Sequence, residues 1–116
     1  MECEKELAAF IRNGVGRRPV QSIGRYFQGS HASCALGAAY EGMYRLPADV
    51  GTAHPSKDLA WFFYCLDVVK KCPGEGCKKR LSLAAVIVHL NDDHKWTREE
   101  IASWLEEEPL PSRVEV

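Results

Sequence analysis

Apolar residues recur at helical spacing along most of this chain. The clearest stripe runs from Leu83 to Leu90 at positions i, i+3, i+4 and i+7, in a stretch that Ser82 can cap. The same spacing is found in four other stretches, which are residues 4–13, 34–44, 57–71 and 97–108. The pattern predicts a mainly α fold of four to five helices around one core.

Local signals mark where several of these elements begin and end. Gly14 is a natural C-terminal stop for the first helix. Thr97 and Glu100 have the spacing of a capping box, which predicts the start of the last helix. Residues 20–27 suit a short strand, with a hairpin turn at Gln28–Gly29. Residues 46–55 are expected to form a loop.

The composition indicates a globular protein with little net charge. The chain has 116 residues, 46% hydrophobic and 27% charged, with a formal net charge of −1. We therefore expect a single domain over residues 1–116, and no nucleic-acid binding driven by bulk charge. Because no apolar run reaches membrane-spanning length and no secretory signal pattern is seen, we expect no membrane association and a cytoplasmic location.

The five cysteines fall into two kinds. Their odd number leaves one over from a complete disulfide framework, which favours a reducing compartment. Cys34 and Cys65 lie among apolar residues and are expected to be small buried hydrophobes. Cys72 and Cys77 instead flank a Pro-Gly-Glu-Gly turn, and a pair of histidines follows them.

The arrangement Cys72-x4-Cys77-x11-His89-x4-His94 predicts a zinc site. Zn²⁺ prefers four thiolate and imidazole ligands in a tetrahedron. On a straight helix the two histidines would diverge by about 140°. The helix should therefore break between them, at Asn91-Asp92-Asp93, which are poor helix formers.

Residues 72–94 resemble a Cys2His2 zinc finger that is one residue short in its middle. Leu81 follows the second cysteine by four, and Val86 precedes the first histidine by three, at the places where fingers carry apolar residues. Four good ligands predict a closed structural site, whereas a catalytic zinc keeps a position for water. Two alternatives involve no metal. Cys72 and Cys77 could form a surface dithiol, and His89 could be a core histidine.

Basic side chains gather in two places and could contact phosphate. One group surrounds the predicted zinc site and consists of Lys70, Lys71, Lys78, Lys79 and Arg80. The other lies within residues 12–25 and consists of Arg12, Arg17, Arg18 and Arg25. The alternative for the first group is that it aids solubility and favours ionised sulfur. The predicted finger helix is apolar almost all round, so base reading by it is not expected.

No enzyme motif stands out in the sequence. His31 lies three residues before Cys34, which could make a thiolate nucleophile, but no third group that would orient the pair is evident. There is no Walker loop and no His-Glu-x-x-His motif. We therefore expect no catalytic residues and a protein that is not an enzyme.

Three stretches, 33–41, 89–94 and 96–102, are similar to a group of small uncharacterised proteins of bacteria and their phages. The resemblance implies a prokaryotic or phage cytoplasmic protein and carries no activity. Together with the predicted site, it favours a non-enzymatic, zinc-stabilised interaction or regulatory protein that binds a protein partner. The alternative is a nucleic-acid-associated regulator that uses the basic groups at 12–25 and 70–80.

Overall fold

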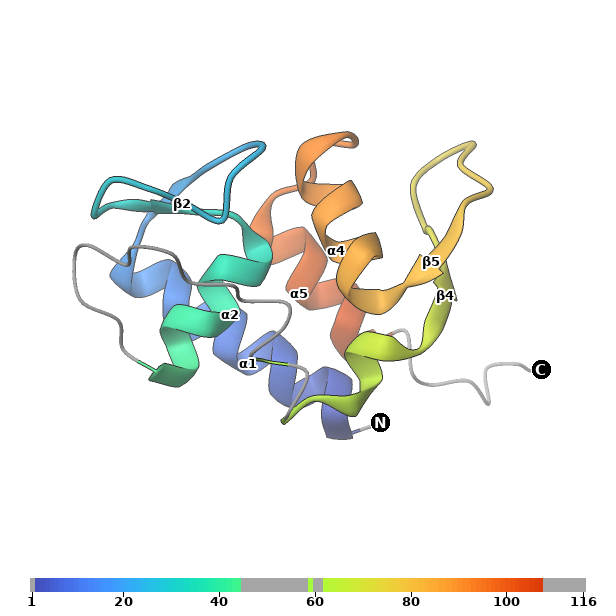
Figure 1. Cartoon of the computed structure of the whole chain (residues 1–116), viewed down its shortest axis with the longest axis horizontal. Coiled ribbons are helices and arrows are strands. Elements are labelled where there is room, and N and C mark those ends of the chain that lie inside the picture. The colour runs from blue at the N-terminus through green and yellow to red at the C-terminus, as the bar shows by residue number, and fades with distance from the viewer. Residues whose placement is uncertain (1, 45–58, 60–61, 108–116) are drawn as a thin grey trace.

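The computed structural model describes residues 2–44, 59 and 62–107, which contain four α-helices, one 3-10 helix and five short strands. In chain order the elements are α1 (Glu2–Arg17), β1 (Val20–Gln21), β2 (Phe27–Gln28), β3 (Ala32–Ser33), α2 (Ala35–Tyr44), the 3-10 helix η1 (Tyr64–Asp67), β4 (Val69–Lys71), β5 (Arg80–Ser82), α4 (Leu83–Asp92) and α5 (Arg98–Glu107) (Figure 1). The predicted mainly α fold with a short hairpin is confirmed.

The core lies between the four α-helices. Helix α1 packs against both α2 and α5, and α4 packs against α2 and α5. The largest fully buried apolar side chains come from all four helices and include Leu7, Ile11, Leu36, Leu83, Ile87, Leu90, Ile101 and Leu105. No helix in the described ranges combines the length and the apolar character needed to cross a bilayer.

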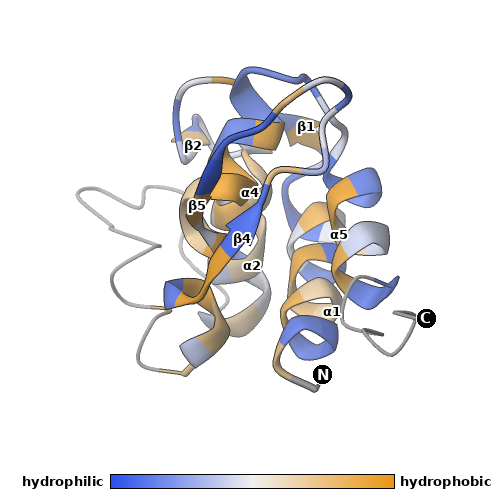
Figure 2. Cartoon of the chain, turned by 90° about the vertical axis from the view of Figure 1, so that its right-hand side faces the viewer, coloured by the Kyte–Doolittle hydropathy of each residue, from blue (hydrophilic) through white to orange (hydrophobic). Residues whose placement is uncertain are grey.

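Two small sheets flank the helices. In the first, β3 is central and pairs parallel to β1 and antiparallel to β2. In the second, β4 and β5 form an antiparallel hairpin that leads directly into α4. Figure 2 shows this hairpin as largely hydrophilic, over the apolar α4. The order strand, strand, helix gives residues 69–92 the layout of a ββα zinc finger.

Two predicted helix starts are confirmed by their caps. The Ser82 hydroxyl accepts a hydrogen bond from the Ala85 amide at 3.3 Å, at the start of α4. At the start of α5, the Glu100 amide donates to the Thr97 hydroxyl at 3.0 Å, and the Thr97 amide donates to the Glu100 carboxylate at 2.8 Å. These reciprocal bonds are the capping box that the sequence predicted.

Gly14 does not end the first helix, so that prediction was wrong. Helix α1 continues to Arg17, and the Arg18 amide still donates to the Gly14 carbonyl. A Cβ atom at Gly14 would lie 1.8 Å from the carbonyl oxygen of Ala38 in α2. The position therefore needs glycine for close contact between two helix backbones, not for a left-handed turn.

The predicted third helix, residues 57–71, was wrong over its described C-terminal half. The structure has η1 followed by β4 there. Leu59 is helical as predicted, whereas residues 57–58 and 60–61 and the predicted loop 46–55 lie outside the described residues. The apolar spacing does identify core residues, because Leu59, Phe63 and Leu66 are buried. Pairing with β5 favours a strand for the β-branched residues that follow.

The predicted strand at 20–27 was wrong as one continuous element. The chain forms β1, turns through Ser22–Arg25 with Gly24 at a φ of +79°, and forms β2. The expected hairpin joins β2 to β3 and turns at Gly29, whose φ is +67°. Glycine favours this left-handed conformation, and that explains why the turn signal was correctly placed.

One disulfide was not predicted. Cys3 in α1 is bonded to Cys65 in η1 across 62 residues, with a Cα–Cα distance of 6.2 Å. Cys65 is buried, as expected, but it is not a free thiol. Cys34 is both free and buried, as predicted. An odd cysteine count excludes complete pairing of all five, but it leaves room for one bond, so the cysteines do not support the reducing compartment that their odd number predicted.

Candidate metal centre

One ligand atom from each of Cys72, Cys77, His89 and His94 lies within 4.8 Å of the others. The Cys72 Sγ and His94 Nε2 atoms are 3.5 Å apart, and so are the Cys77 Sγ and His89 Nε2 atoms. Tetrahedral zinc, with bonds of about 2.3 Å to sulfur and about 2.0–2.1 Å to nitrogen, places these atom types about 3.5 Å apart. The four predicted ligands are thus brought together and could hold a metal ion.

The turn between β4 and β5 aims both sulfurs toward α4. The Cys72 amide donates to the Lys79 carbonyl at 2.8 Å, and the Cys77 amide donates to the Gly74 carbonyl at 3.0 Å. The Gly74 amide in turn donates to the Cys72 sulfur at 3.3 Å. Gly76 has a φ of +75°, a conformation that glycine adopts readily. The glycines in this turn therefore allow both thiols to point inward.

Gly74 also makes room for one of the imidazoles. A Cβ atom at this position would lie 2.4 Å from Cε1 of His94. The His94 ring therefore rests directly on the backbone of the turn. Any larger residue at position 74 would push this ring away from the sulfurs.

The break between the two histidines is confirmed. Helix α4 ends at Asp92, and the His94 amide donates to the His89 carbonyl, five residues back, at 3.2 Å. Lys95 follows with a φ of +58°. The wider turn brings the imidazole rings of His89 and His94 to a centroid distance of 4.7 Å, nearly perpendicular to each other.

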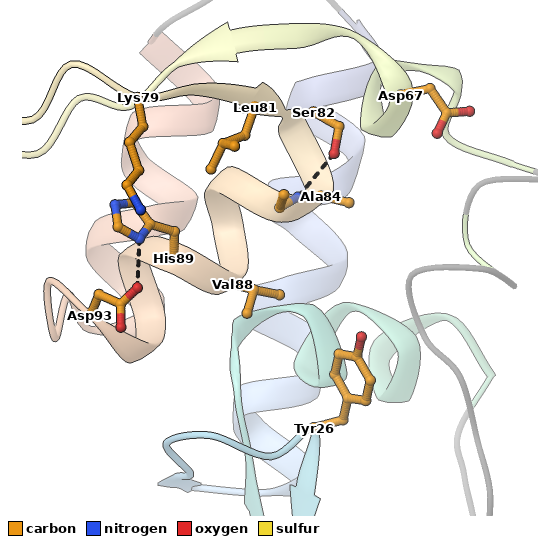
Figure 3. Close-up of a pocket in the computed structure, with 10 residues that line it drawn as sticks. Tyr26, Asp67, Lys79, Leu81, Ser82, Ala84, Val88, His89 and Asp93 are labelled. Atoms are coloured by element: carbon orange, nitrogen blue, oxygen red, sulfur yellow. Dashed lines mark hydrogen bonds and ion pairs between the residues drawn. The ribbon is translucent and has the colours of Figure 1, made fainter.

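Asp93 orients His89 from the side away from the sulfurs. The His89 Nδ1 atom lies 2.7 Å from a carboxylate oxygen of Asp93, as the dashed line in Figure 3 marks. With Nδ1 donating its proton to Asp93, the Nε2 lone pair faces the sulfurs. Histidine ligands of metals commonly carry such a carboxylate partner. From the sequence, Asp92 and Asp93 could assist a metal or lie in a solvated loop, and the i+4 spacing of Asp93 from His89 is the signal for the orienting contact.

The two thiols differ in their proton affinity. Hydrogen bonding from the Lys79 amide, followed by the His89 and His94 side chains, lowers the pKa of Cys77 to about 6. Burial raises the pKa of the Cys72 thiol. Cys77 and Asp93 both raise the pKa of His89. Without a metal ion, Cys77 is therefore the thiolate of the cluster, and thiolate is the form of cysteine that binds metals.

The basic residues around this cluster lie mainly on the hairpin surface. Lys71 and Arg80 are exposed and directly opposite each other in the β4–β5 register. Lys78 and Lys79 are exposed as well. Lys70 differs, because its ammonium group lies 3.5 Å from a carboxylate oxygen of the buried Glu4.

The basic group at residues 12–25 is mostly engaged with carboxylates. Arg12 binds Glu99, at 2.7 Å, and Glu106. Arg17 and Arg18 both bind the buried carboxylate of Glu41. Arg25 is exposed. These ion pairs leave the hairpin as the more accessible of the two basic groups.

An open groove of about 760 Å³ runs beside the metal centre, across the outer face of α4. Its floor contains Leu81, Ala84 and Val88 (Figure 3). Lys79, His89 and Asp93 lie together at one end, and Tyr26 forms part of the opposite wall. The groove combines an apolar floor with charges of both signs.

The proposed nucleophile Cys34 has an unsuitable environment. It is buried, and burial raises the pKa of its thiol to about 11. His31 is exposed, and its Nε2 atom lies 3.3 Å from the Ser30 hydroxyl. A protonated thiol is a poor nucleophile, so this pair adds nothing in favour of enzymatic chemistry.

No protein-family model, curated protein or solved structure matches the chain. The similarity to bacterial and phage proteins therefore gains no support from these comparisons. The likeness to a Cys2His2 finger depends on this chain's own four converging ligands and on its strand-strand-helix order.

Proposed function

We propose that Cys72, Cys77, His89 and His94 bind one Zn²⁺ ion in a closed structural site. The observation that carries this proposal is the convergence of all four ligand atoms within 4.8 Å. Two thiolates and two imidazoles suit zinc, and four protein ligands fill the tetrahedron that structural zinc adopts. The ion would fix the β4–β5 turn to the C-terminal end of α4.

The expected energy of such a site is large for a small protein. Structural zinc contributes about 10–16 kcal/mol of apparent binding free energy in finger peptides at neutral pH. A typical domain has a free energy of unfolding of about 5–15 kcal/mol. Loss of the ion should therefore release the turn and lower the thermal stability of the protein.

The protein itself is proposed to be a non-enzymatic interaction or regulatory protein of prokaryotic or phage type, acting in the cytoplasm on a protein partner. A closed zinc site offers no position for a reacting water. The groove on α4 supports a polypeptide partner, since its apolar floor and mixed charges are typical of surfaces that bind proteins. The N-terminal residues 83–88 of α4 carry none of the side chains that read bases, and Asn91 near its C-terminal end is buried.

The metal content of the purified protein tests the zinc proposal. We expect about one zinc per chain in protein purified without added metal, and loss of that zinc in Cys72→Ser. Cys34→Ser is the matched control, because Cys34 is a free, buried cysteine outside the cluster. A zinc-free wild-type protein, or equal zinc in wild type and Cys72→Ser, would contradict the proposal.

Phosphate binding by the hairpin is the second candidate function. It is supported by four exposed basic residues on one hairpin, Lys71, Lys78, Lys79 and Arg80. Fluorescence anisotropy with a generic DNA duplex at two salt concentrations tests it, since phosphate contacts weaken steeply with salt. Salt-dependent binding that Lys78→Glu weakens would favour this function over a protein partner. Absence of binding at low salt would exclude it.

A further inference from the structure

We propose that Cys77, together with Cys72, is a site of oxidation by peroxides, and that forming the Cys72–Cys77 disulfide releases the metal ion. This inference rests on the proposed zinc site and adds a form of regulation to it. It follows from the placement of all five cysteines, each of which lies in the described part of the chain.

Cys77 is the cysteine that solvent reaches. It is half-buried, at the turn between β4 and β5. The other cysteines are 1–7% exposed, and they are Cys3, Cys34, Cys65 and Cys72. A small oxidant in solution should therefore meet Cys77 first.

Cys72 is placed to complete the reaction. Its sulfur belongs to the same cluster as that of Cys77, with ligand atoms at most 4.8 Å apart. The connecting turn contains Gly74 and Gly76, whose backbones adapt easily. Closing the two sulfurs to the disulfide distance of about 2.05 Å requires a movement of less than about 3 Å. Exposed cysteines with a nearby second thiol are typical redox-sensitive pairs.

The chemistry is balanced with a peroxide as the oxidant. The Cys77 thiolate attacks one peroxide oxygen, the O–O bond breaks, and sulfenic acid and hydroxide form, the latter taking a proton to become water. The Cys72 thiolate then attacks the Cys77 sulfur, the S–OH bond breaks, and the departing hydroxide takes a second proton. Two thiolates are oxidised, one peroxide is reduced, and the metal loses both sulfur ligands.

The rest of the hairpin should stay in place after this reaction. Its base is held near α1 by the Cys3–Cys65 disulfide in η1 and by the ion pair between Lys70 and Glu4. The Leu83 amide also donates to the Val68 carbonyl, which fixes the start of α4. Oxidation would thus release the turn and His94 from the metal while the helical core remains folded.

Peroxide titration of the zinc-loaded protein tests the inference. Released zinc is followed with a chromogenic chelator, and the disulfide is mapped by mass spectrometry of peptides. We expect one zinc to be released for each Cys72–Cys77 disulfide formed, and rebinding after thiol reduction. Cys34→Ser should behave as wild type, because Cys34 lies outside the cluster.

A second measurement does not depend on the metal. In Cys72→Ser the sulfenic acid at Cys77 has no resolving thiol, so a dimedone-type reagent should label Cys77. In Cys77→Ser, the buried Cys72 should remain unlabelled.

Zinc that remains bound in excess peroxide, or release without the Cys72–Cys77 disulfide, would overturn the inference. The zinc content before peroxide separates this failure from failure of the zinc site itself.

Discussion

The α1–α2 contact and the hairpin–α4 contact hold their parts together by different means. Between α1 and α2 the backbones touch, because Gly14 faces Ala38 and Gly42 faces Phe10 without side chains between them. The β4–β5 hairpin carries exposed apolar residues such as Val69, which is 59% exposed, and its turn meets α4 through the four ligand atoms. Close packing determines the first contact, whereas in the second we propose that a bound ion fixes the turn to α4.

A buried carboxylate, that of Glu41, also stabilises the α1–α2 contact. Burial alone raises the pKa of Glu41, but hydrogen bonds from Arg17 and Arg18 outweigh this and hold the pKa below its ordinary value. The carboxylate is only 1% exposed. Protein atoms alone therefore make the α1–α2 contact. Substitutions in it should change the free energy of unfolding by the same amount with and without zinc.

The largest expected effect is that of Gly14→Ala. The added Cβ would lie 1.8 Å from the Ala38 carbonyl oxygen, so the two helices must separate. We expect a loss of at least about 3 kcal/mol in the free energy of unfolding, the upper end for overpacked cores. Gly16→Ala is the matched control, since nothing lies within 4 Å of that Cβ. Urea unfolding of both variants measures the difference, and equal stabilities would contradict the packing account.

Glu41→Gln should have the next largest effect. It removes the negative charge from a buried site that holds Arg18, and breaking such a pair costs about 3 kcal/mol. The folded pKa of Glu41 lies below its unfolded value, so its stabilisation is complete above the unfolded pKa of about 4.3 and is lost as the pH falls through the folded pKa. Thermal melts from about pH 6 to pH 3 should therefore show a smaller drop for the variant than for wild type.

Asp93→Asn should weaken metal binding by about 10- to 100-fold, because His89 loses the carboxylate that accepts its Nδ1 proton. Competition with a chelator of known zinc affinity measures this change. Asp67→Asn is a suitable control, since Asp67 lines the same groove but lies outside the cluster. Unlike the effect of Gly14→Ala, the effect of Asp93→Asn on stability should be smaller in the zinc-free protein, where only the exposed contact with His89 is lost. An unchanged zinc affinity would argue against the orienting role.

Thr97→Ala should have the smallest effect, about 1 kcal/mol from loss of the helix cap. The capping box lies outside both contacts, so the cost should be the same with and without zinc. Chemical denaturation in zinc and in chelator tests this. A cost confined to the zinc-loaded protein would mean that the start of α5 is coupled to the metal centre.

Features set by residues close in sequence could be predicted from the sequence. The four candidate ligands lie in one turn and at one helix end, so their spacing was sufficient to predict that they converge. The capping box of Thr97 and Glu100 is equally local. The break after Asp92 followed from the geometry of an α-helix and the positions of the two histidines.

Features that depend on distant partners could not be predicted. Gly14 has the same local signature whether it ends a helix or faces Ala38 in another helix. Strand β4 exists because it pairs with β5, although its residues continue a helical pattern. The Cys3–Cys65 bond joins residues 62 positions apart, and no spacing rule selects this pair among five cysteines.

X-ray absorption spectroscopy of the zinc-loaded protein tests the central claim most directly. The claim predicts a zinc shell of two sulfurs at about 2.3 Å and two nitrogens at about 2.0–2.1 Å, with no water ligand. Replacing His94 should exchange one imidazole nitrogen for a solvent-derived oxygen ligand and leave both sulfurs. A shell without sulfur, or one with a water in place of an imidazole in the wild type, would contradict a closed site built from Cys72, Cys77, His89 and His94.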